Sequence, residues 1–388
     1  MYHLRRLSAL VLSLAIAPLL FLPTPAAAAN EDSMPLVLSS ASALLMEKET
    51  GTVLLQQNAH QKLEPASVTK IMTLLLVMEA VDSGRLSLDE LVPVSAHAAG
   101  MGGSQVYLKE GEQLSVSDLI KCVAVVSGND CAVALAERLA GSESAFVDQM
   151  NQKAQSLGMA DTHFVNCTGL PAPGHLTSAW DIALMSRELI LHHPDIQQYT
   201  TIWTDSIRNG AFGLTNTNRL VRFYDGATGL KTGFTASAQY CMSATAQRNG
   251  MELIAVVMKA PTTAQRFQDA SSLLDYGFAN YALITPQPES PLAPVDVLLG
   301  RSKTVQPQLQ RECHLLVEKT QADQVTTRVD LAQDVQAPVD PGQTLGEFQV
   351  YVGNELRDSV PIVAAQGVDR LSVPGLFSQL LRRLLFAG

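Results

Sequence analysis

The sequence predicts an α/β (α+β) fold: an antiparallel sheet flanked by helices, with an all-helical lobe beside it and a small all-β domain after it. Two β-type hairpins, at residues 43–56 and 239–258, enclose a long stretch with helical periodicity. This order suits a chain that closes one antiparallel sheet from its two ends. Beyond a proline-rich stretch at residues 286–294, short β-like runs separated by turns take over.

The N-terminus is typical of a secretory signal peptide over residues 1–29. Arg5 and Arg6 precede an apolar run at residues 7–22, and small alanines end the segment. The alternative is an uncleaved transmembrane anchor, but the apolar run is shorter than the roughly 20 residues that span a bilayer. We therefore expect export to the outer face of the cytoplasmic membrane, in the periplasm or outside the cell.

Composition excludes several classes of protein. The 388 residues are 47% hydrophobic and 16% charged, enough for a large core. The net charge of −10 becomes −12 when the signal peptide and its two arginines are removed, which argues against a nucleic-acid partner. The five cysteines are an odd number without zinc-like spacing, and the eight histidines are scattered, so we expect no obligatory disulfide, metal or cofactor.

The first domain is predicted to cover residues 30–285. Its first hairpin turns at residues 49–51, and Pro65 then favours the first turn of a helix that runs to about residue 82. This helix is apolar nearly all round, which predicts burial at the centre of the domain. Further helices are predicted at 116–126, 130–140, 143–157 and 178–193, and Asn249-Gly250 marks the turn of the second hairpin.

The C-terminal part is predicted to contain a β domain over residues 286–368 and an amphipathic helix over residues 369–388. The β domain carries no catalytic constellation, which indicates a spacer or an interaction module. In the final helix leucines recur on one face while Arg382 and Arg383 lie on the other. This pattern predicts a membrane-surface anchor; the alternative is a helix that docks on its own protein.

Ser67 and Lys70 stand three residues apart at the start of the buried helix, within hydrogen-bonding reach of each other. A serine hydroxyl needs a base to become a nucleophile, and a lysine can be that base when burial or a second cation lowers its pKa. The first helical turn also offers free backbone N–H groups to a developing oxyanion. By itself this pair is weak evidence, because it also occurs by chance.

Two later motifs add to the serine–lysine pair. Ser127, in a break between two helices, can relay a proton, and Asn129 offers an amide that can hold the substrate backbone and Lys70. The third motif, Lys231-Thr232-Gly233, lies just before a predicted strand. Lys231 can attract a substrate carboxylate and depress the pKa of Lys70, Thr232 adds a hydroxyl donor, and Gly233 leaves the strand edge open to substrate.

This ordered set resembles the serine penicillin-binding proteins and serine β-lactamases, and the Ser-Gly-Asn form of the middle motif is similar to that of the low-molecular-mass D-alanyl-D-alanine carboxypeptidases. The resemblance covers roughly residues 36–282. It also includes the segments Met101–Ser104, Gly111-Glu112, Ser127–Asp130, Thr168–Leu170, Thr215–Asn218 and Asp225–Thr235.

The resemblance implies a reaction and a β-lactamase/transpeptidase-like fold for the catalytic domain. Ser67 would attack the carbonyl of the penultimate D-alanine in a peptidoglycan stem peptide and release the last D-alanine, limiting cross-linking, and penicillins would acylate the same serine. Backbone N–H groups of Ser67 and Phe234 would form the oxyanion hole. Arg266 matches an arginine that recognises the terminal carboxylate; the alternatives are a surface role for Arg266 and a recognition role for Arg208.

Three other functions stay open. A serine β-lactamase is one, although the middle motif carries Gly128 in place of aspartate and no Glu-x-x-Leu-Asn segment lies between Ser127 and Lys231. A non-catalytic peptidoglycan-binding protein is another, which the intact motifs argue against. An endopeptidase that cuts cross-links would use the same chemistry in a differently shaped cleft. Phe234 follows Lys-Thr-Gly, at a position where the family often has a polar residue. The sequence therefore departs from the family's side-chain preference at this position.

Overall fold

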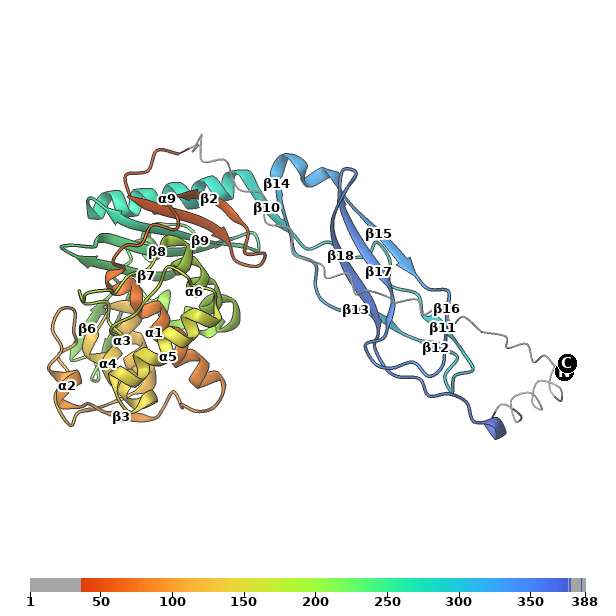
Figure 1. Ribbon diagram of the computed structural model, residues 1–388, viewed down its shortest axis with the longest axis horizontal. Helices are drawn as coiled ribbons and strands as arrows, with labels where there is room; N and C mark the ends of the chain where they lie inside the picture. Colours follow the sequence, from red (N-terminus) through yellow and green to blue (C-terminus); the bar gives the residue numbers. More distant parts are fainter. Residues whose placement is uncertain (1–35, 376, 378–384, 386–388) are drawn as a thin grey trace, which may run out of the picture.

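The computed structural model describes residues 36–375, 377 and 385. In these residues the chain forms a large domain of sheet and helices and an elongated domain of strands, which lie side by side in Figure 1. The predicted signal peptide lies outside the described residues. No helix within the described ranges is both long and apolar enough to cross a membrane.

A five-stranded antiparallel sheet crosses the large domain in the order β2-β1-β9-β8-β7. The N-terminal hairpin therefore pairs with the later one through β1 and β9, which confirms that the chain closes the sheet from its two ends. The Asn249-Gly250 turn joins β8 and β9 as expected. The strands are β1 (Ser42–Glu47), β2 (Val53–Gln57), β7 (Ala227–Thr235), β8 (Gln239–Arg248) and β9 (Met251–Ala260).

Both faces of the sheet are covered. Alternate residues of a strand point to opposite sides, so β1 contributes to an apolar cluster on each face. Leu44 and Met46 of β1 pack into the cluster shared with the helical lobe. Ala43 and Leu45 pack on the other face, in the cluster that includes α9 (Thr263–Asn280). Figure 1 shows α9 above the sheet and the lobe below it, so the sheet is the middle layer of three.

The helical lobe is built around α1, which follows one turn of 3₁₀ helix, and all but three of the thirteen α1 residues are buried. Side chains of Ser115, Ser142 and Ser178 cap the helices that follow them by accepting backbone N–H groups. The helices predicted for this lobe are all present. The lobe contains η1 (Ala66–Thr69), α1 (Lys70–Asp82), α2 (Ala96–Ala99), α3 (Val116–Val125), α4 (Asn129–Ala140), α5 (Glu143–Ser156), α6 (Ala179–His192), η2 (Pro194–Ile196), α7 (Gln197–Thr200) and α8 (Leu220–Phe223).

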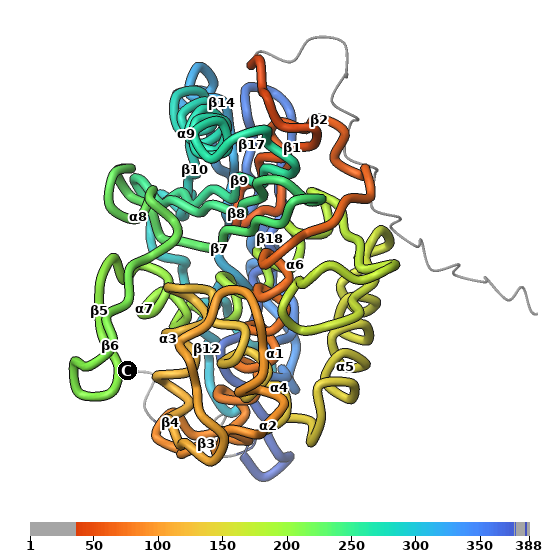
Figure 2. The backbone as a smooth tube through the Cα atoms, turned by 90° about the vertical axis from the view of Figure 1, so that its left-hand side faces the viewer, coloured from red at the N-terminus to blue at the C-terminus, as the bar shows by residue number. Residues whose placement is uncertain are grey.

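Two small hairpins in the lobe were not predicted: β3 (Leu91–Pro93) with β4 (Gln113–Ser115), and β5 (Thr204–Ile207) with β6 (Phe212–Thr215). Strands of three or four residues are too short to show an alternating pattern. Figure 2 shows the β5–β6 hairpin and α5 on opposite sides of the lobe.

The C-terminal domain is all β, as predicted, and holds two apolar clusters. Its main sheet has the order β13-β18-β17-β15, and a smaller sheet has the order β12-β11-β16. The strand β10, which ends before the proline-rich stretch, pairs with β14 beyond it. The strands are β10 (Tyr281–Ile284), β11 (Val295–Leu298), β12 (Thr304–Val305), β13 (Pro307–Leu309), β14 (Leu315–Glu318), β15 (Val325–Leu331), β16 (Asp334–Gln336), β17 (Thr344–Val352) and β18 (Glu355–Ala364), with η3 (Lys319–Gln324) between β14 and β15.

Beyond β18 the chain stays in contact with the β domain for several residues. Arg370 bridges to Gly300, and the Leu371 amide donates to the Leu299 carbonyl, so the start of the predicted 369–388 helix is extended here. Helical residues are described from Val373. Most of the predicted amphipathic helix lies outside the described residues.

All five cysteines are buried and unpaired. Cys122, Cys131 and Cys167 lie in the helical lobe, Cys241 lies on β8, and Cys313 lies in the β domain. Burial raises the pKa of the Cys241 thiol to about 11, and burial together with Asp358 raises the pKa of the Cys313 thiol to about 12.

Candidate active site

The segment before α1 holds Ser67 in the single turn of η1. Pro65 precedes this turn, and Ala66 adopts a left-handed φ of 48°. Ser67 is partly exposed, whereas Ala66 and Val68 on either side of it are buried. The hydroxyl of Ser67 is therefore presented at the surface of a rigid, buried element.

Lys70 begins α1 and is fully buried. Its Nζ lies 3.1 Å from Ser67 Oγ, 2.6 Å from Asn129 Oδ1 and 2.7 Å from the Thr168 carbonyl oxygen. The predicted contact between Ser67 and Lys70 is present in the structure, and so is the predicted contact between Asn129 and Lys70. The carbonyl of Thr168 is a third partner.

Burial lowers the pKa of the Lys70 ammonium to about 7, although Cys167, Asp130 and Cys131 favour the charged form. The sequence predicts a contribution from Lys231 to this effect. Burial is the largest cause, and the two buried ammonium groups also repel each other. Burial, Lys70 and Arg266 together hold the pKa of Lys231 well below its ordinary value.

Ser127 lies between α3 and α4, and Asn129 is the first residue of α4. Ser127 has a left-handed φ of 63°, and within the described residues its buried Oγ has no hydrogen-bond partner. Asn129 is held at its backbone and at its side chain. Its backbone N–H donates to the Ser104 carbonyl, and its side-chain Nδ2 donates to the Gly102 carbonyl. Asn129 is thus fixed in place, while the Ser127 hydroxyl is free to bond a reacting group.

Asp130 explains how the neighbouring loop is positioned. Its carboxylate is fully buried and accepts backbone N–H groups from Val106 and Leu108 across the loop, and from Cys131 next to it. Backbone N–H donors can stabilise a buried carboxylate without a cation. Asp130 therefore ties the loop of residues 101–108 to the start of α4, beside Asn129.

The third motif lies inside β7, the edge strand beside η1, so the prediction that Lys231, Thr232 and Gly233 precede a strand is wrong. Lys231 is 1% exposed and its Nζ donates to the Thr232 carbonyl at 2.9 Å. Thr232 Oγ1 donates to Thr217 Oγ1 at 2.7 Å. The Lys231 side chain thus lies behind the surface of the cleft, and the hydroxyls of Thr217 and Thr232 lie at that surface.

Gly233 is required for the contact of β7 with the nucleophile segment. A Cβ at this position would lie 2.9 Å from the Pro65 carbonyl oxygen and 3.0 Å from the backbone nitrogens of Ser67 and Val68. The sequence predicts that Gly233 leaves the strand edge open to substrate. The structure shows that the crowding comes from the chain's own backbone at Ser67.

Phe234 and Arg266 complete the predicted set. Phe234 is 54% exposed, and its ring centroid lies 4.5 Å from that of Tyr240. Arg266 is 6% exposed, so the surface alternative is wrong. Its Nη1 donates to the Gly233 carbonyl, its guanidinium stacks 4.6 Å from the Phe267 ring centroid, and burial lowers its pKa to about 10.

Arg208 has a different role from the one considered for it. It lies in the turn between β5 and β6, and its guanidinium donates to the Glu112 carboxylate at 2.6 Å and to the Val106 carbonyl at 2.9 Å. It is not among the residues that line the cavity at Ser67. Arg208 therefore fastens the β5–β6 hairpin to the 101–112 loop.

These residues surround one cavity of about 290 Å³. Lys70, Asn129 and Lys231 are buried behind its surface, in contact with residues that form it. All nine predicted site residues are thus brought together. The lining consists of Ser67, Ser104, Ser127, Thr217, Thr232, Gly233, Phe234, Tyr240 and Arg266.

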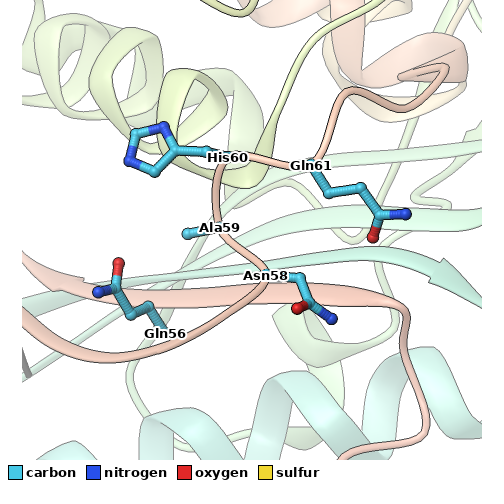
Figure 3. A pocket seen from close by; sticks show the side chains of 5 residues that line it. All are labelled: Gln56, Asn58, Ala59, His60 and Gln61. Atoms are coloured by element: carbon cyan, nitrogen blue, oxygen red, sulfur yellow. The ribbon is translucent and has the colours of Figure 1, made fainter. Parts of the chain in front are cut away.

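A second, polar pocket of about 370 Å³ lies where the chain leaves β2, at residues 56–61. His60 and Gln61 point to opposite sides of this segment (Figure 3). His60 is occupied by structural contacts, because its ring stacks on Trp180 and bonds Asp161. This pocket contains none of the predicted site residues, and it is not the candidate active site.

Comparison with known families agrees with this geometry. Residues 28–262 match the family of D-alanyl-D-alanine carboxypeptidases, and residues 287–370 match the C-terminal domain of penicillin-binding protein 5. The chain belongs to the D-alanyl-D-alanine carboxypeptidase family. Members of this family are serine hydrolases, so the nucleophile predicted for the cavity is of the right chemical type.

Relatives and solved structures cover most of the chain. The carboxypeptidase DacF of Bacillus subtilis is 37% identical, over 93% of this chain and 95% of its own. DacC of Escherichia coli is 33% identical, over 90% and 89%. Penicillin-binding protein 5 from Haemophilus influenzae has a TM-score of 0.74 at 29% identity, covering 87% of this chain and all of the other. Ampicillin-bound penicillin-binding protein D2 from Listeria monocytogenes has a TM-score of 0.58 at 36% identity, over 63% of this chain.

The carboxypeptidase cleft also contains a network that the sequence analysis missed. His175 Nδ1 accepts the Val165 amide at 3.0 Å, and its Nε2 lies 2.8 Å from Thr69 Oγ1. Thr69 Oγ1 donates to the carbonyl of Ala66, next to Ser67. Burial lowers the pKa of His175 to about 4, so this neutral histidine holds the nucleophile turn from behind.

Gly169 also packs against the Ala66 carbonyl and Thr69. A Cβ there would lie 1.8 Å from the Ala66 carbonyl oxygen, so only glycine fits. The motif Thr168–Leu170 signalled this loop in the sequence, but His175 follows it without a recognisable pattern. Among the described residues no three His, Cys, Asp or Glu side chains are grouped as metal ligands.

Proposed function

We propose that the chain is an exported serine-type D-Ala-D-Ala carboxypeptidase that removes the terminal D-alanine of peptidoglycan stem peptides through an acyl-enzyme on Ser67. The observation that carries the proposal is the Ser67–Lys70 pair. The two groups lie 3.1 Å apart, and the pKa of Lys70 is lowered to about 7. A large fraction of Lys70 is therefore neutral near pH 7 and can accept a proton.

Acylation follows from this pair. Lys70 takes the proton of the Ser67 hydroxyl as Ser67 Oγ attacks the carbonyl carbon of the penultimate D-alanine. Backbone N–H groups of Ser67 and Phe234 stabilise the oxyanion. The close approach of β7 at Gly233 supports this arrangement, because it brings the two backbones together.

Departure of D-alanine needs a proton on its amine. Ser127 is suited to deliver it, since its hydroxyl lines the cavity and has no partner within the described residues. Lys70 supplies the proton through Ser127, and water then hydrolyses the ester. Asn129 holds Lys70 in place and binds the substrate backbone.

The terminal carboxylate of the substrate binds at Thr232 and Arg266. Both line the cavity, and Arg266 is a buried guanidinium without a carboxylate partner in the described part of the chain. Lys231 adds positive potential from behind the surface. A peptide that ends in a free carboxylate is therefore favoured, which is the definition of a carboxypeptidase substrate.

β-Lactams are proposed as inhibitors that acylate Ser67. Solved relatives from Listeria monocytogenes hold ampicillin or cefotaxime. In the cell the reaction would limit cross-linking during wall synthesis, because it removes the pentapeptide donor. A β-lactamase is the nearest rival, and it would hydrolyse penicillin rapidly instead of keeping it bound.

Location and anchoring form a separate part of the proposal. The signal-peptide pattern at residues 1–29 supports export, and the amphipathic pattern of residues 376–385 supports attachment to a membrane surface. The β domain would then act as a spacer between the membrane and the catalytic domain. A chain that ends at Ser372 should keep its activity in solution and lose membrane association; unchanged retention of a signal-cleaved protein would refute the anchor.

The proposed reaction is tested with a labelled penicillin and with diacyl-Lys-D-Ala-D-Ala. The mature protein should form a slowly decaying adduct, which peptide mass spectrometry places on Ser67, and should release D-alanine from the tripeptide. Ser67→Ala should do neither, while its circular dichroism stays unchanged, because one hydroxyl is lost. Rapid penicillin turnover would instead support a β-lactamase, and an adduct on Ser67→Ala would rule out this nucleophile.

A further inference from the structure

The turn between β11 and β12 exposes two consecutive leucines. The side chains of Leu298 and Leu299 are 50% and 41% exposed, and neither packs in an apolar cluster of the described residues. Leu299 also has a left-handed φ of 58°, which leucine rarely adopts. The fold itself gains little from this arrangement, and an observed backbone strain of this kind points to a function.

The fold holds this turn tightly. The Val297 amide donates to the Lys303 carbonyl at 2.7 Å and closes the turn at its base. A Cβ on Gly300 would lie 2.6 Å from Val297 Cγ1 and 2.7 Å from the Ser302 carbonyl oxygen, so the turn is closely packed on itself. The two leucines are therefore fixed on the outside of the β domain.

The turn lies at the end of the β domain that is farther from the catalytic domain. Figure 1 shows β11, β12 and β16 near this end, where the described chain also leaves the domain. The Leu371 amide donates to the Leu299 carbonyl at 2.8 Å, and the Arg301 amide donates to the Asp369 carbonyl at 2.8 Å. The turn and the start of the C-terminal segment thus form one continuous edge.

The described residues that follow this edge are also apolar and exposed. Val373 is 82% exposed, Phe377 is 66% exposed and Leu385 is 68% exposed. The C-terminal segment that leaves this edge therefore presents apolar side chains to the outside, as the turn does.

Basic residues accompany the leucines at this edge. Residues 298–303 and 368–372 contain three basic residues and one acidic residue, a net charge of +2 in a chain of net charge −10. Arg301 pairs with Asp369 at 3.5 Å, but no ion pair among the described residues of the β domain includes Lys303 or Arg370. Exposed apolar side chains beside free cations fit a membrane surface with anionic headgroups.

We propose that the turn of residues 298–303 is a second membrane contact of this protein. Leu298 and Leu299 insert at the level of the headgroups, and Lys303 and Arg370 pair with anionic lipid phosphates. This inference rests on the proposed membrane attachment, because the C-terminal segment brings the turn to the lipid surface. Two leucines are too few to hold the protein there alone, so a chain that ends at Ser372 should still detach.

A second contact has a consequence for the catalytic domain. Attachment through a C-terminal helix alone would leave the elongated β domain free to tilt on the membrane. The turn lies at the tip of that domain, opposite the catalytic domain (Figure 1). Contact at the tip restricts the tilt and thereby sets the height of the catalytic cleft above the membrane.

The test measures binding of the full mature chain to vesicles of phosphatidylcholine with and without phosphatidylglycerol. Leu298→Gln combined with Leu299→Asn should weaken binding to both kinds of vesicle about tenfold, because two apolar contacts are lost. Asparagine is chosen because it tolerates the left-handed φ. Lys303→Gln combined with Arg370→Gln should weaken binding about tenfold at low salt, and only to vesicles that contain phosphatidylglycerol.

Matched controls remove an exposed leucine and an exposed basic residue elsewhere on the β domain. Leu356, near the turn between β17 and β18, is 47% exposed, and Arg328 on β15 is also exposed. Leu356→Gln and Arg328→Gln should each leave vesicle binding within about twofold of wild type. All variants should release D-alanine from diacyl-Lys-D-Ala-D-Ala at the wild-type rate, because the catalytic domain is unchanged.

Hydrogen exchange on the vesicle-bound protein gives a direct readout of the contact. Peptides that cover residues 298–303 should exchange more slowly on vesicles than in solution, whereas those that cover residues 353–357 should exchange equally in both. Equal exchange of residues 298–303 in both conditions would contradict the contact.

The outcomes separate this inference from the proposals on which it rests. If the full chain binds vesicles and the double leucine variant binds them equally well, this inference is overturned while the C-terminal anchor stands. Stronger binding of that variant would also overturn it, because the leucines would then hold the C-terminal helix against the protein. A full mature chain that binds neither kind of vesicle would remove the anchor and this inference together, and the carboxypeptidase proposal would stand.

Discussion

The two domains of this protein differ in what they bury. Every described side chain that is polar or charged and buried lies between Ser40 and Asp269, including Lys70, Lys231 and Asp130. Residues 287–375 bury no such side chain. The cores of the β domain are apolar, with Phe348 and its neighbours fully buried.

This contrast indicates that the first domain carries the chemistry and the β domain has a supporting role. A buried polar group destabilises the fold unless it is bonded, so its presence indicates a use for it. In the catalytic domain Lys70, Asn129 and Lys231 are buried behind the cavity at Ser67, and Asp130 fixes the loop beside Asn129. The β domain has no comparable cluster, which is consistent with a spacer and with an activity that resides in the first domain.

After the loss of Ser67 itself, the largest expected effect comes from Lys70. Lys70→Ala should lower the rate constant of penicillin acylation about a thousandfold, because Ser67 loses its general base. In the unsubstituted protein this rate constant should rise with pH through about 7, since only the neutral amine accepts a proton. Stopped-flow acylation across pH 5 to 9 measures both; a rate that is flat across this range would contradict the role of Lys70 as the base.

The next effect tests the approach of β7 to the nucleophile. Gly233→Ala should lower acylation about a hundredfold, because the new methyl group displaces the backbone at Ser67. Gly213 offers a matched control, since a Cβ there meets nothing within 4 Å. If Gly233→Ala and Gly213→Ala acylate at the same rate, the contact with Ser67 has no catalytic importance.

His175 gives a smaller effect of the same kind. His175→Ala should lower acylation about tenfold, because Thr69 and the Ala66 carbonyl lose their support behind Ser67. His175→Gln keeps an N–H donor for Thr69 and should recover most of the rate. A purely structural role predicts a lower free energy of unfolding with an unchanged acylation rate in the folded protein, and rate and stability are therefore measured together.

The smallest effect on activity is expected in the β domain. Phe348→Ala should lower the free energy of unfolding of that domain by about 3–5 kcal/mol, because it leaves a cavity in an apolar core. Acylation of Ser67 should stay within about twofold of the wild-type rate. Denaturant unfolding followed by far-ultraviolet circular dichroism, with acylation measured in parallel, tests this independence; a large loss of acylation would show that the two domains are coupled.

The sequence was most informative where function restricts it. The serine, lysine and glycine motifs located the cavity, because nucleophile, base and close backbone approach each require a particular residue type. The alternating and helical patterns of residues 43–56, 70–82 and 239–258 predicted the sheet and its central helix. These segments are long enough for their periodicity to be recognised.

Other features could not be predicted because they depend on contacts between distant segments. Burial was predicted as one possible cause of a lowered Lys70 pKa, but the carbonyl of Thr168 as a partner of its ammonium is seen only in the structure. His175 reaches Thr69 across 106 residues, and Tyr240 lines the cavity from the start of β8. For Arg266 the sequence left a surface role open beside carboxylate recognition; the helix that carries it packs against β8 and β9, the strands next to β7 in the sheet.

Labelling of the five buried thiols can report local opening of the protein. A maleimide can reach a thiol only when the surrounding core opens, and the raised pKa values of Cys241 and Cys313 slow any reaction before that. Cys313 reports on the β domain, and Cys241 reports on the sheet beside the cleft. Labelling rates resolved by peptide mass spectrometry would therefore measure the opening of each domain separately, in the native chain and without an introduced probe.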